Sequence, residues 1–332
     1  MPARTPPPEV SLLELVRTLS AFAPARVNLR RAPWDTYVDW AIANGLGPLA
    51  AYNLEYRLTG GGAPEWVRDR LLSVYQGSVN DNVMKLVAFK RAVDELQGRR
   101  ILLLGAASHA EVLYPHIAFR PVTEVRLHVS PADLDPFTGF LRGEGFRLLE
   151  GELPKEEGAV RGLTDDHLIV LLYTSLLGPR RAEAEAQLVA RAQPVKVYGP
   201  SMFRPELEDA ILLLCLEQAR AGYQVPLVTF VDLREMLTGA RHVNTVYTRQ
   251  PDLEVLKKRA AEWRIERALY TSLSITGRLF PETEEATRAA MPELRGASKA
   301  LLDRLVVEPV TALGGMRVVR GVDRLRRLLA GG

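Results

Sequence analysis

Three polar residues alternate along one short segment of the chain, and their types limit the chemistry that this segment can support. Glu124, Arg126 and His128 occupy every second position, and valine or leucine fills the positions after each of them. Because successive side chains of a β-strand point to opposite faces, the polar groups share one face and the apolar groups share the other. A carboxylate can bind a metal cation, whereas a guanidinium only donates hydrogen bonds. The pattern predicts a half-buried strand in which Glu124 and Arg126 form an ion pair with each other or with neighbours.

His128 offers a second kind of chemistry on the same face, which we expect to be exposed. Imidazole and carboxylate groups can bind a metal together, so a site shared with Glu124 is one interpretation. A proton-transfer role for His128 is another. The histidines of this central region match no zinc-binding spacing, so we expect them to be scattered on the surface. They are His109, His116, His128 and His167.

A glycine follows the apolar run that precedes this strand. Residues 101–104 predict a buried strand, and Gly105 leads into a predicted helix that contains Ala106 and Ser108. The start of a helix presents unpaired backbone N–H groups that can hold a phosphate. A tight turn from strand to helix also needs a glycine for steric reasons alone. Both interpretations stay open for Gly105, Ala106 and Ser108.

The order of these features resembles the signature of an uncharacterised bacterial family of nucleotidyltransferases. In that signature a strand ends in Lys-Gly, and Tyr-Pro and Arg-Pro pairs lead into a strand that carries two aspartates. The matching pairs here are Leu104-Gly105, Tyr114-Pro115, Arg120-Pro121 and, in the C-terminal helical region, Asp232-Leu233. The resemblance extends over about residues 11 to 280. It implies an α/β (α+β) fold, with a nucleotidyltransferase-like mixed sheet flanked by N-terminal and C-terminal helical regions.

The positions that would carry the chemistry of this family are substituted. Leu104 stands in place of the lysine, Glu124 and Arg126 stand in place of the aspartates, and Glu217 stands where a histidine is frequent. A third acidic position is expected on a later strand, yet residues 168–172 are wholly apolar. Mg²⁺ requires oxygen ligands in octahedral geometry, which an arginine does not supply. The substitutions therefore predict that two-metal phosphoryl transfer has been lost.

Other polar and reactive side chains have structural interpretations. Asp165 and Asp166 are expected to cap a loop. Arg120 is expected to anchor the loop before the strand, although it could also hold a phosphate. Cys215 lies in an apolar run and is interpreted as a buried thiol. Residues 317–327 predict a basic amphipathic helix that is solvated or that contacts nucleic acid, an anionic membrane or a partner.

Composition and periodicity limit the remaining possibilities. The 332 residues are 47% hydrophobic, and 43 Lys and Arg against 40 Asp and Glu give a net charge of +3, which does not favour nucleic acid. A single cysteine and the lack of a leader or membrane-spanning run predict a cytoplasmic protein. Ser11 and Glu14 form a predicted capping box at the first helix. We expect a helical region over 1–98, a core over 99–200, and a helical region with a basic tail over 201–332.

These observations predict a nucleotidyltransferase-fold protein that has lost catalysis and acts in binding, regulation or scaffolding without a cofactor. A protein partner or a small ligand is expected in the cleft or on the helical surface, and a nucleotide is a further candidate. The alternative is an active enzyme that uses Mg²⁺ to transfer a nucleotide from an NTP to a hydroxyl of a small molecule or protein. Its metal ligands would be Glu124 together with some of Asp133, Asp135, Asp165 and Asp166.

Overall fold

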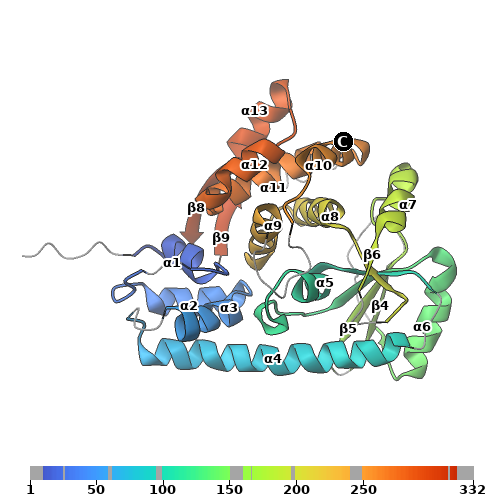
Figure 1. The fold of residues 1–332 in the computed structure, drawn as a ribbon, viewed down its shortest axis with the longest axis horizontal. Helices are drawn as coiled ribbons and strands as arrows, with labels where there is room; N and C mark the ends of the chain where they lie inside the picture. Colours follow the sequence, from blue (N-terminus) through green and yellow to red (C-terminus); the bar gives the residue numbers. More distant parts are fainter. Residues whose placement is uncertain are drawn as a thin grey trace, which may run out of the picture.

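The structure is a computed structural model that describes most of the chain. The described residues are 10–24, 27–58, 62–94, 99–149, 160–165, 167–195, 199–239, 249–312 and 315–319, with only the backbone described from 307 onward. Figure 1 shows a sheet near one end of the long helix α4 (Glu65–Asp94) and the N-terminal helices near its other end. The C-terminal helices lie above the sheet and the N-terminal helices in this view, on the side away from α4.

The N-terminal region is helical, as its periodicity predicts. Helix α1 (Leu12–Leu19) begins at the predicted capping box, in which the Ser11 amide donates to the Glu14 carboxylate at 2.7 Å and the Glu14 amide donates to the Ser11 hydroxyl at 3.2 Å. The helices that follow are α2 (Trp34–Ala43), α3 (Gly47–Tyr52), the π-helical turn η1 (Asn53–Arg57) and α4.

The sheet has seven strands in the order β3-β4-β5-β2-β1-β7-β6 and is mixed. The strands are β1 (Ile101–Leu104), β2 (Val125–His128), β3 (Arg147–Leu148), β4 (Val160–Thr164), β5 (Ile169–Tyr173), β6 (Gln193–Pro194) and β7 (Met202–Arg204). The helical segments between them are α5 (Gly105–Val112), η2 (Ile117–Phe119), η3 (Pro131–Asp133), α6 (Leu134–Gly143), η4 (Pro179–Arg181) and α7 (Ala182–Arg191). This is the predicted α/β class, with helices flanking the sheet.

The register of the central strands places Arg126 between two leucines. Leu104 of β1 lies opposite Arg126 in an antiparallel pair, and Arg126 lies opposite Leu171 of β5 in a parallel pair. On the other face of β2, Val125 and Leu127 have no exposed surface and pack in a cluster with phenylalanines of α4 and α6. The predicted alternation of β2 is therefore confirmed, because one face is sealed in apolar packing while the other presents Arg126.

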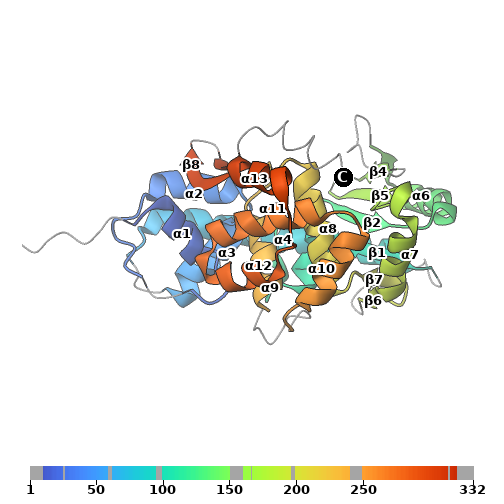
Figure 2. The same ribbon diagram turned by 90° about the horizontal axis from the view of Figure 1, so that it is seen from above.

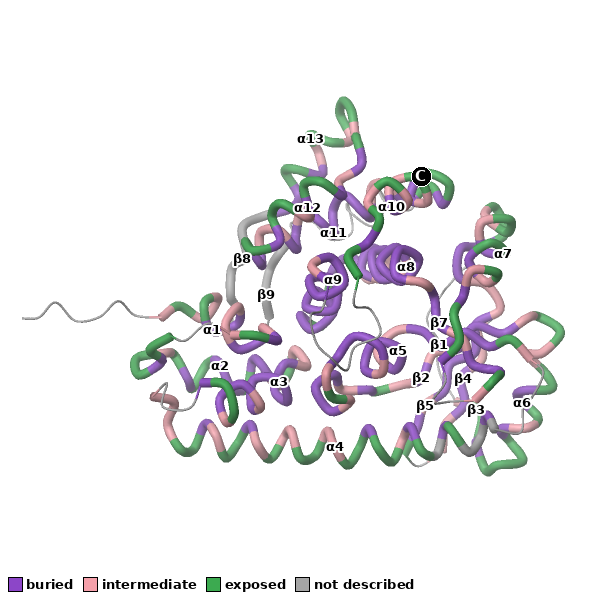
Figure 3. Tube along the Cα trace, viewed as in Figure 1, coloured by how far each residue is buried: buried purple, intermediate pink, exposed green. Residues whose placement is uncertain are grey.

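The C-terminal helices lie on the side of the sheet that presents Arg126, and α8 is the one that contacts Arg126. They are α8 (Leu207–Arg220), α9 (Val228–Thr238), α10 (Leu253–Glu262), α11 (Glu266–Leu279), η6 (Pro281–Thr283), α12 (Glu284–Ala290) and α13 (Gly296–Leu305). Figure 2 shows them lying over α4 with α8 next to the sheet, and Figure 3 shows that α8 and α9 are mostly buried. Cys215 of α8 is buried as predicted, and burial raises the pKa of its thiol to about 12.

The prediction of a basic helix over residues 317–327 is wrong for residues 317–319, the part that the structure describes. Strand β9 (Gly315–Val319) contains Arg317 and pairs with β8 (Val306–Ala312). Valines occupy several positions of both segments, and β-branched side chains favour strands over helices. Residues 320–327 lie outside the described part of the chain, as do the proline-rich residues 1–9.

The helical regions and the sheet share one apolar cluster. It includes Leu15 of α1, Tyr173 of β5 and Leu214 of α8, all buried. The predicted boundaries near residues 98 and 200 stay a prediction. None of the described helices is both long enough and apolar enough to cross a membrane.

The junction of α10 and α11 contains a residue in a left-handed conformation. Arg264 is exposed and has φ of +54°, which costs an L-residue with a Cβ atom roughly 1–2 kcal/mol. We expect Arg264→Gly to raise the free energy of unfolding by about 0.5–1 kcal/mol, because glycine adopts this conformation without that steric cost. Urea unfolding followed by circular dichroism measures the difference.

The control for this prediction is Lys258→Gly, which also removes one exposed cation but lies inside α10. Glycine in a helix interior lowers stability by roughly 0.5–1 kcal/mol, so the two substitutions should act in opposite directions. Two changes of the same sign would show that Arg264 is not strained.

Candidate functional site

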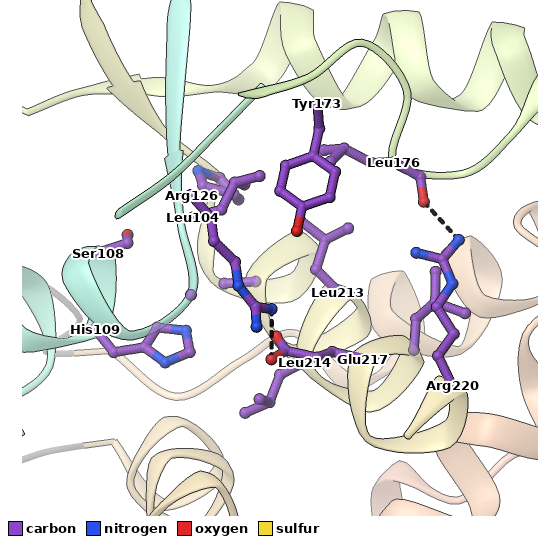
Figure 4. A pocket seen from close by; sticks show the side chains of 14 residues that line it. Leu104, Ser108, His109, Arg126, Tyr173, Leu176, Leu213, Leu214, Glu217 and Arg220 are labelled. Carbon is purple, nitrogen blue, oxygen red and sulfur yellow. Dashed lines mark hydrogen bonds and ion pairs between the residues drawn. The ribbon is translucent and has the colours of Figure 1, made fainter. Parts of the chain in front are cut away.

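A small pocket lies where β1, β2 and α5 meet α8 (Figure 4). Its polar lining comes from Ser108, His109, Arg126, Glu217 and Arg220. Its apolar lining includes Leu104, Tyr173, Leu176, Pro205, Ala210, Leu213, Leu214 and Leu216. The cavity offers about 60 Å³ to the centres of water molecules, and one buried water needs roughly 10–15 Å³ on this measure. A group the size of a few waters therefore fits inside it.

Arg126 is held between two carboxylates at the edge of this pocket. Its Nε lies 2.5 Å from an oxygen of Glu124, and its Nη1 lies 2.7 Å from Glu217 Oε1. Burial acts to lower the pKa of Arg126, but Glu217 and Glu124 outweigh it and the pKa is raised above its ordinary value. The guanidinium therefore stays charged, and the ion pair predicted from the sequence is confirmed.

The residues present at this position do not fit Mg²⁺. The row of paired strand positions through Arg126 is Leu104, Arg126 and Leu171, of which Leu104 and Arg126 line the pocket, and Arg126 has only leucines beside it in this row. The two nearby carboxylates, Glu124 and Glu217, both contact the guanidinium. Among the described residues, no three His, Cys, Asp or Glu side chains come together as a metal site. An octahedral metal needs oxygen ligands where this chain places a cation.

The aspartates considered for a displaced metal site have other partners. Asp133 pairs with Arg99 and accepts from the Ser130 hydroxyl. Asp135 pairs with Arg161 at 2.6 Å. Asp165 accepts from the backbone amides of residues 167 and 168 at 2.7 and 2.5 Å, which is the predicted loop cap. Asp166 lies outside the described residues.

Gly105 forms the predicted turn between strand and helix. Its φ is +59°, which favours glycine, and Leu104 at the N-cap of α5 provides no side-chain hydrogen bond. Gly105 and Ser108 line the pocket, and Ser108 is 3% exposed, whereas Ala106 is not among the lining residues. The steric role of Gly105 is thus established by its backbone, and phosphate binding by this helix start stays a prediction.

A protein-family model described as an uncharacterised nucleotidyltransferase matches residues 30–281. The chain belongs to this uncharacterised nucleotidyltransferase family. The resemblance inferred from the sequence is therefore confirmed over most of the chain. No protein in the curated set matches the sequence.

In this nucleotidyltransferase-family protein a buried aspartate joins the core to α9. Asp232 is fully buried and accepts from the Tyr114 hydroxyl at 2.7 Å and from Arg120 Nε at 3.0 and 3.1 Å. His109 Nδ1 lies 3.1 Å from the same carboxylate. Arg120 thus anchors its loop by an ion pair with Asp232, and this confirms the structural role expected for it. The four side chains are called the Asp232 hub below.

The charges around Asp232 keep it ionised. Burial acts to raise its pKa, but the attraction of Arg120 and then of His109 outweighs burial and lowers the pKa from 3.8 to about 2. The ionised carboxylate therefore stabilises the fold above pH 4, and this contribution is lost as the pH falls toward 2.

We predict that the stability difference between wild type and Asp232→Asn shrinks as the pH falls from 5 to 2.5. Other carboxylates titrate in the same range, and comparing the two proteins cancels their contribution. Urea midpoints at pH 5, 4, 3 and 2.5 measure this difference. A difference that is constant with pH would contradict the lowered pKa of Asp232.

His128 is not part of the exposed face that the sequence predicts. It is 7% exposed, and its Nε2 lies 3.1 Å from Oε1 of Glu185 on α7. Burial acts to raise the pKa of Glu185, but hydrogen bonds from His128 and from the Leu177 amide lower it below its ordinary value. These contacts do not support the interpretation in which His128 shares a metal site with Glu124, because α7 covers this end of β2 and supplies the partner of His128.

The expectation that the central histidines are scattered on the surface is half correct. His116 and His167 are exposed, whereas His109 and His128 are buried beside carboxylates. Sequence reasoning gave His109 no role and treated Asp232 only as a family match. One signal was available, since Asp232 lies among the apolar residues Phe230, Val231 and Leu233, and a buried carboxylate needs hydrogen-bonding partners.

Proposed function

We propose that this family member does not transfer nucleotides by metal-dependent chemistry and that it acts by binding a small ligand or a protein partner at the pocket. The observation that supports the proposal is the position of Arg126, whose guanidinium contacts both nearby carboxylates. A metal ion at this point would have to displace that guanidinium from Glu124 and Glu217. Mg²⁺ would then compete with a partly buried ion pair instead of entering a set of free oxygens.

The fold tolerates such a change because the two faces of β2 have separate roles. Val125 and Leu127 hold the strand against α4 and α6 through apolar packing that does not depend on the residue at position 126. The pocket face can therefore change its chemistry while the sheet keeps its register. A protein whose pocket-facing residues are substituted in this way keeps a shaped cavity, and the cavity can still bind a ligand or partner.

One observation favours the alternative of an active enzyme. Glu124 and Glu217 both approach the same point, since each contacts Arg126. Movement of Arg126 out of the pocket would leave two carboxylates that could serve as metal ligands. The resulting enzyme would transfer a nucleotide to a hydroxyl of a small molecule or protein. Lack of the third carboxylate on β5, where Leu171 and Tyr173 face the pocket side, weighs against this alternative.

Calorimetric titration with each NTP, with and without Mg²⁺ or Mn²⁺, tests the proposal. We expect any nucleotide binding to be independent of the metal, with Kd changed less than about twofold by either ion. A metal that tightens nucleotide binding tenfold or more would contradict the proposal. Glu254→Gln, on an exposed residue of α10, serves as a charge-matched reference for variants of the pocket carboxylates. A cytoplasmic location remains part of the proposal.

A further inference from the structure

Helix α4 carries most of the large apolar side chains that the structure leaves exposed. Seven such side chains are exposed among the described residues, and four of them, Trp66, Val83, Met84 and Val87, belong to α4. The last three lie on neighbouring turns and form one patch, with exposed fractions of 43, 64 and 46%. Single exposed apolar residues are common, whereas a contiguous patch marks a contact with another molecule. Figure 1 shows α4 along the border of the molecule, so this patch is accessible.

The exposed residues of α4 follow the repeat of a coiled coil. Figure 3 shows exposed positions on turn after turn of this helix. They recur at alternating spacings of three and four residues, and we call this row the α4 seam: Trp66, Asp69, Ser73, Gln76, Asn80, Val83, Val87 and Lys90. Such spacing keeps the row on one side of a helix, which is how two helices pack along their length. The α4 seam therefore fits another long helix.

The two halves of this face complement each other in size. If a second α4 runs in the opposite direction and crosses the first near Asn80, Met84 of one copy lies opposite Gly77 of the other. Val87 then lies opposite Ser73 in the same way. A Cβ atom on Gly77 would meet nothing within 4 Å, so the space above this glycine is open to an incoming side chain. An asparagine inside such a seam fixes the alignment of the two helices.

The charges near the ends of α4 favour the antiparallel direction. Glu65 and Asp69 are exposed near its start, Lys90 is exposed near its end, and none of the three pairs with another described residue. Antiparallel helices bring the acidic end of one copy to Lys90 of the other, whereas parallel helices would bring Lys90 against Lys90. The helix dipoles also attract each other only when the helices are antiparallel.

We propose that this protein forms an antiparallel homodimer through the α4 seam. A helix of 30 residues is about 45 Å long and roughly 10–12 Å wide, so the contact covers about 450–540 Å² of each copy. This is close to the lower limit of roughly 1,000 Å² in total for a specific interface, and we therefore expect a weak dimer with Kd of about 1–100 µM. The inference does not depend on the ligand of the pocket, which lies on the other side of the sheet from α4.

Sedimentation velocity of the full chain at about 1 to 200 µM tests whether the dimer forms and which face it uses. We expect Met84→Glu to raise Kd by more than about tenfold, because it places a charge in the middle of the contact. The control is Ala289→Glu, which adds the same charge at an exposed position of α12, on the side of the molecule away from α4, and should leave Kd unchanged. A monomer at every concentration, or equal effects of the two substitutions, would overturn the inference.

A charge exchange tests the direction of the helices. Lys90→Glu should raise Kd by about 3–10-fold, because it replaces an attraction with a repulsion at both ends of the dimer. Adding Asp69→Lys to the same chain restores opposite charges in the antiparallel arrangement and should return Kd to near the wild-type value. A double variant that dimerises as weakly as Lys90→Glu would contradict this arrangement.

Cross-linking with a short bismaleimide tests the alignment directly. The native Cys215 is buried, so a cysteine introduced at an exposed position is the reactive thiol. Asn80→Cys should link to its own copy. In the antiparallel dimer the two copies of position 73 lie about 21 Å apart, as do those of position 87. Ser73→Cys and Val87→Cys should therefore link only when the two variants are mixed. Self-linking of Ser73→Cys, or no linking of the mixture, would overturn the inference.

Discussion

Asp232→Ala is expected to lower the free energy of unfolding by about 3–5 kcal/mol, the usual cost of removing one partner from a buried ion pair. The substitution leaves the Arg120 guanidinium buried without its counterion, since its side chain is 10% exposed and Asp232 is its ion-pair partner. It also leaves the Tyr114 hydroxyl and the His109 ring without their shared acceptor. Urea unfolding at pH 7 measures the loss, and a variant that fails to accumulate as folded protein agrees with it.

The matched control removes an aspartate from an exposed ion pair. Asp39 pairs with Arg70 at 3.4 Å, and their side chains are 79% and 61% exposed. Exposed pairs contribute roughly 0–1 kcal/mol, so Asp39→Ala should change the stability by less than about 1 kcal/mol. Similar losses of stability in the two variants would show that the Asp232 hub stabilises the fold no more than an exposed ion pair does.

Arg126→Asp is expected to create a metal site that the wild type lacks. The new carboxylate would lie beside Glu124 and Glu217, which both contact position 126. Three carboxylates at one point suit Mn²⁺ or Mg²⁺ and repel each other when no metal is present. We therefore expect the variant to be less stable than wild type in EDTA. Metal at about 100 times its Kd should raise the stability by roughly 2.7 kcal/mol.

Thermal unfolding of wild type, Arg126→Asp and Arg126→Leu with EDTA, Mg²⁺ or Mn²⁺ tests this prediction. Leucine removes the cation without adding a ligand, so its response to metal should be smaller than that of aspartate. Wild type should not respond. A wild type that is stabilised by metal as much as the aspartate variant would show that Arg126 does not occupy the metal position.

Local patterns account for the parts of the fold that could be predicted. The capping box of α1 depends on two residues three positions apart, and the alternation of β2 depends on the geometry of a strand. The ion pair of Arg126 with Glu124 spans two positions and was predicted from the same alternation. Such features are local, because neighbouring residues determine them without knowledge of the rest of the chain.

Contacts between distant segments account for the parts that could not be predicted. Asp232 meets His109, Tyr114 and Arg120 across 112 to 123 positions of the chain. His128 was expected on an exposed face, but helix α7 covers it and provides its carboxylate partner. Polar groups on a strand do not reveal whether another element will lie over them, and burial of this end of β2 depends on how the whole chain packs.

The most direct test of the central claim is an assay for pyrophosphate release by the purified chain, with each NTP in turn and with Mg²⁺ or Mn²⁺. If Arg126 occupies the position of a metal ligand, release should not exceed that of a control without protein, whichever nucleotide, metal or acceptor hydroxyl is supplied. Metal-dependent release above that background by wild type, abolished by Glu124→Gln, would contradict the account.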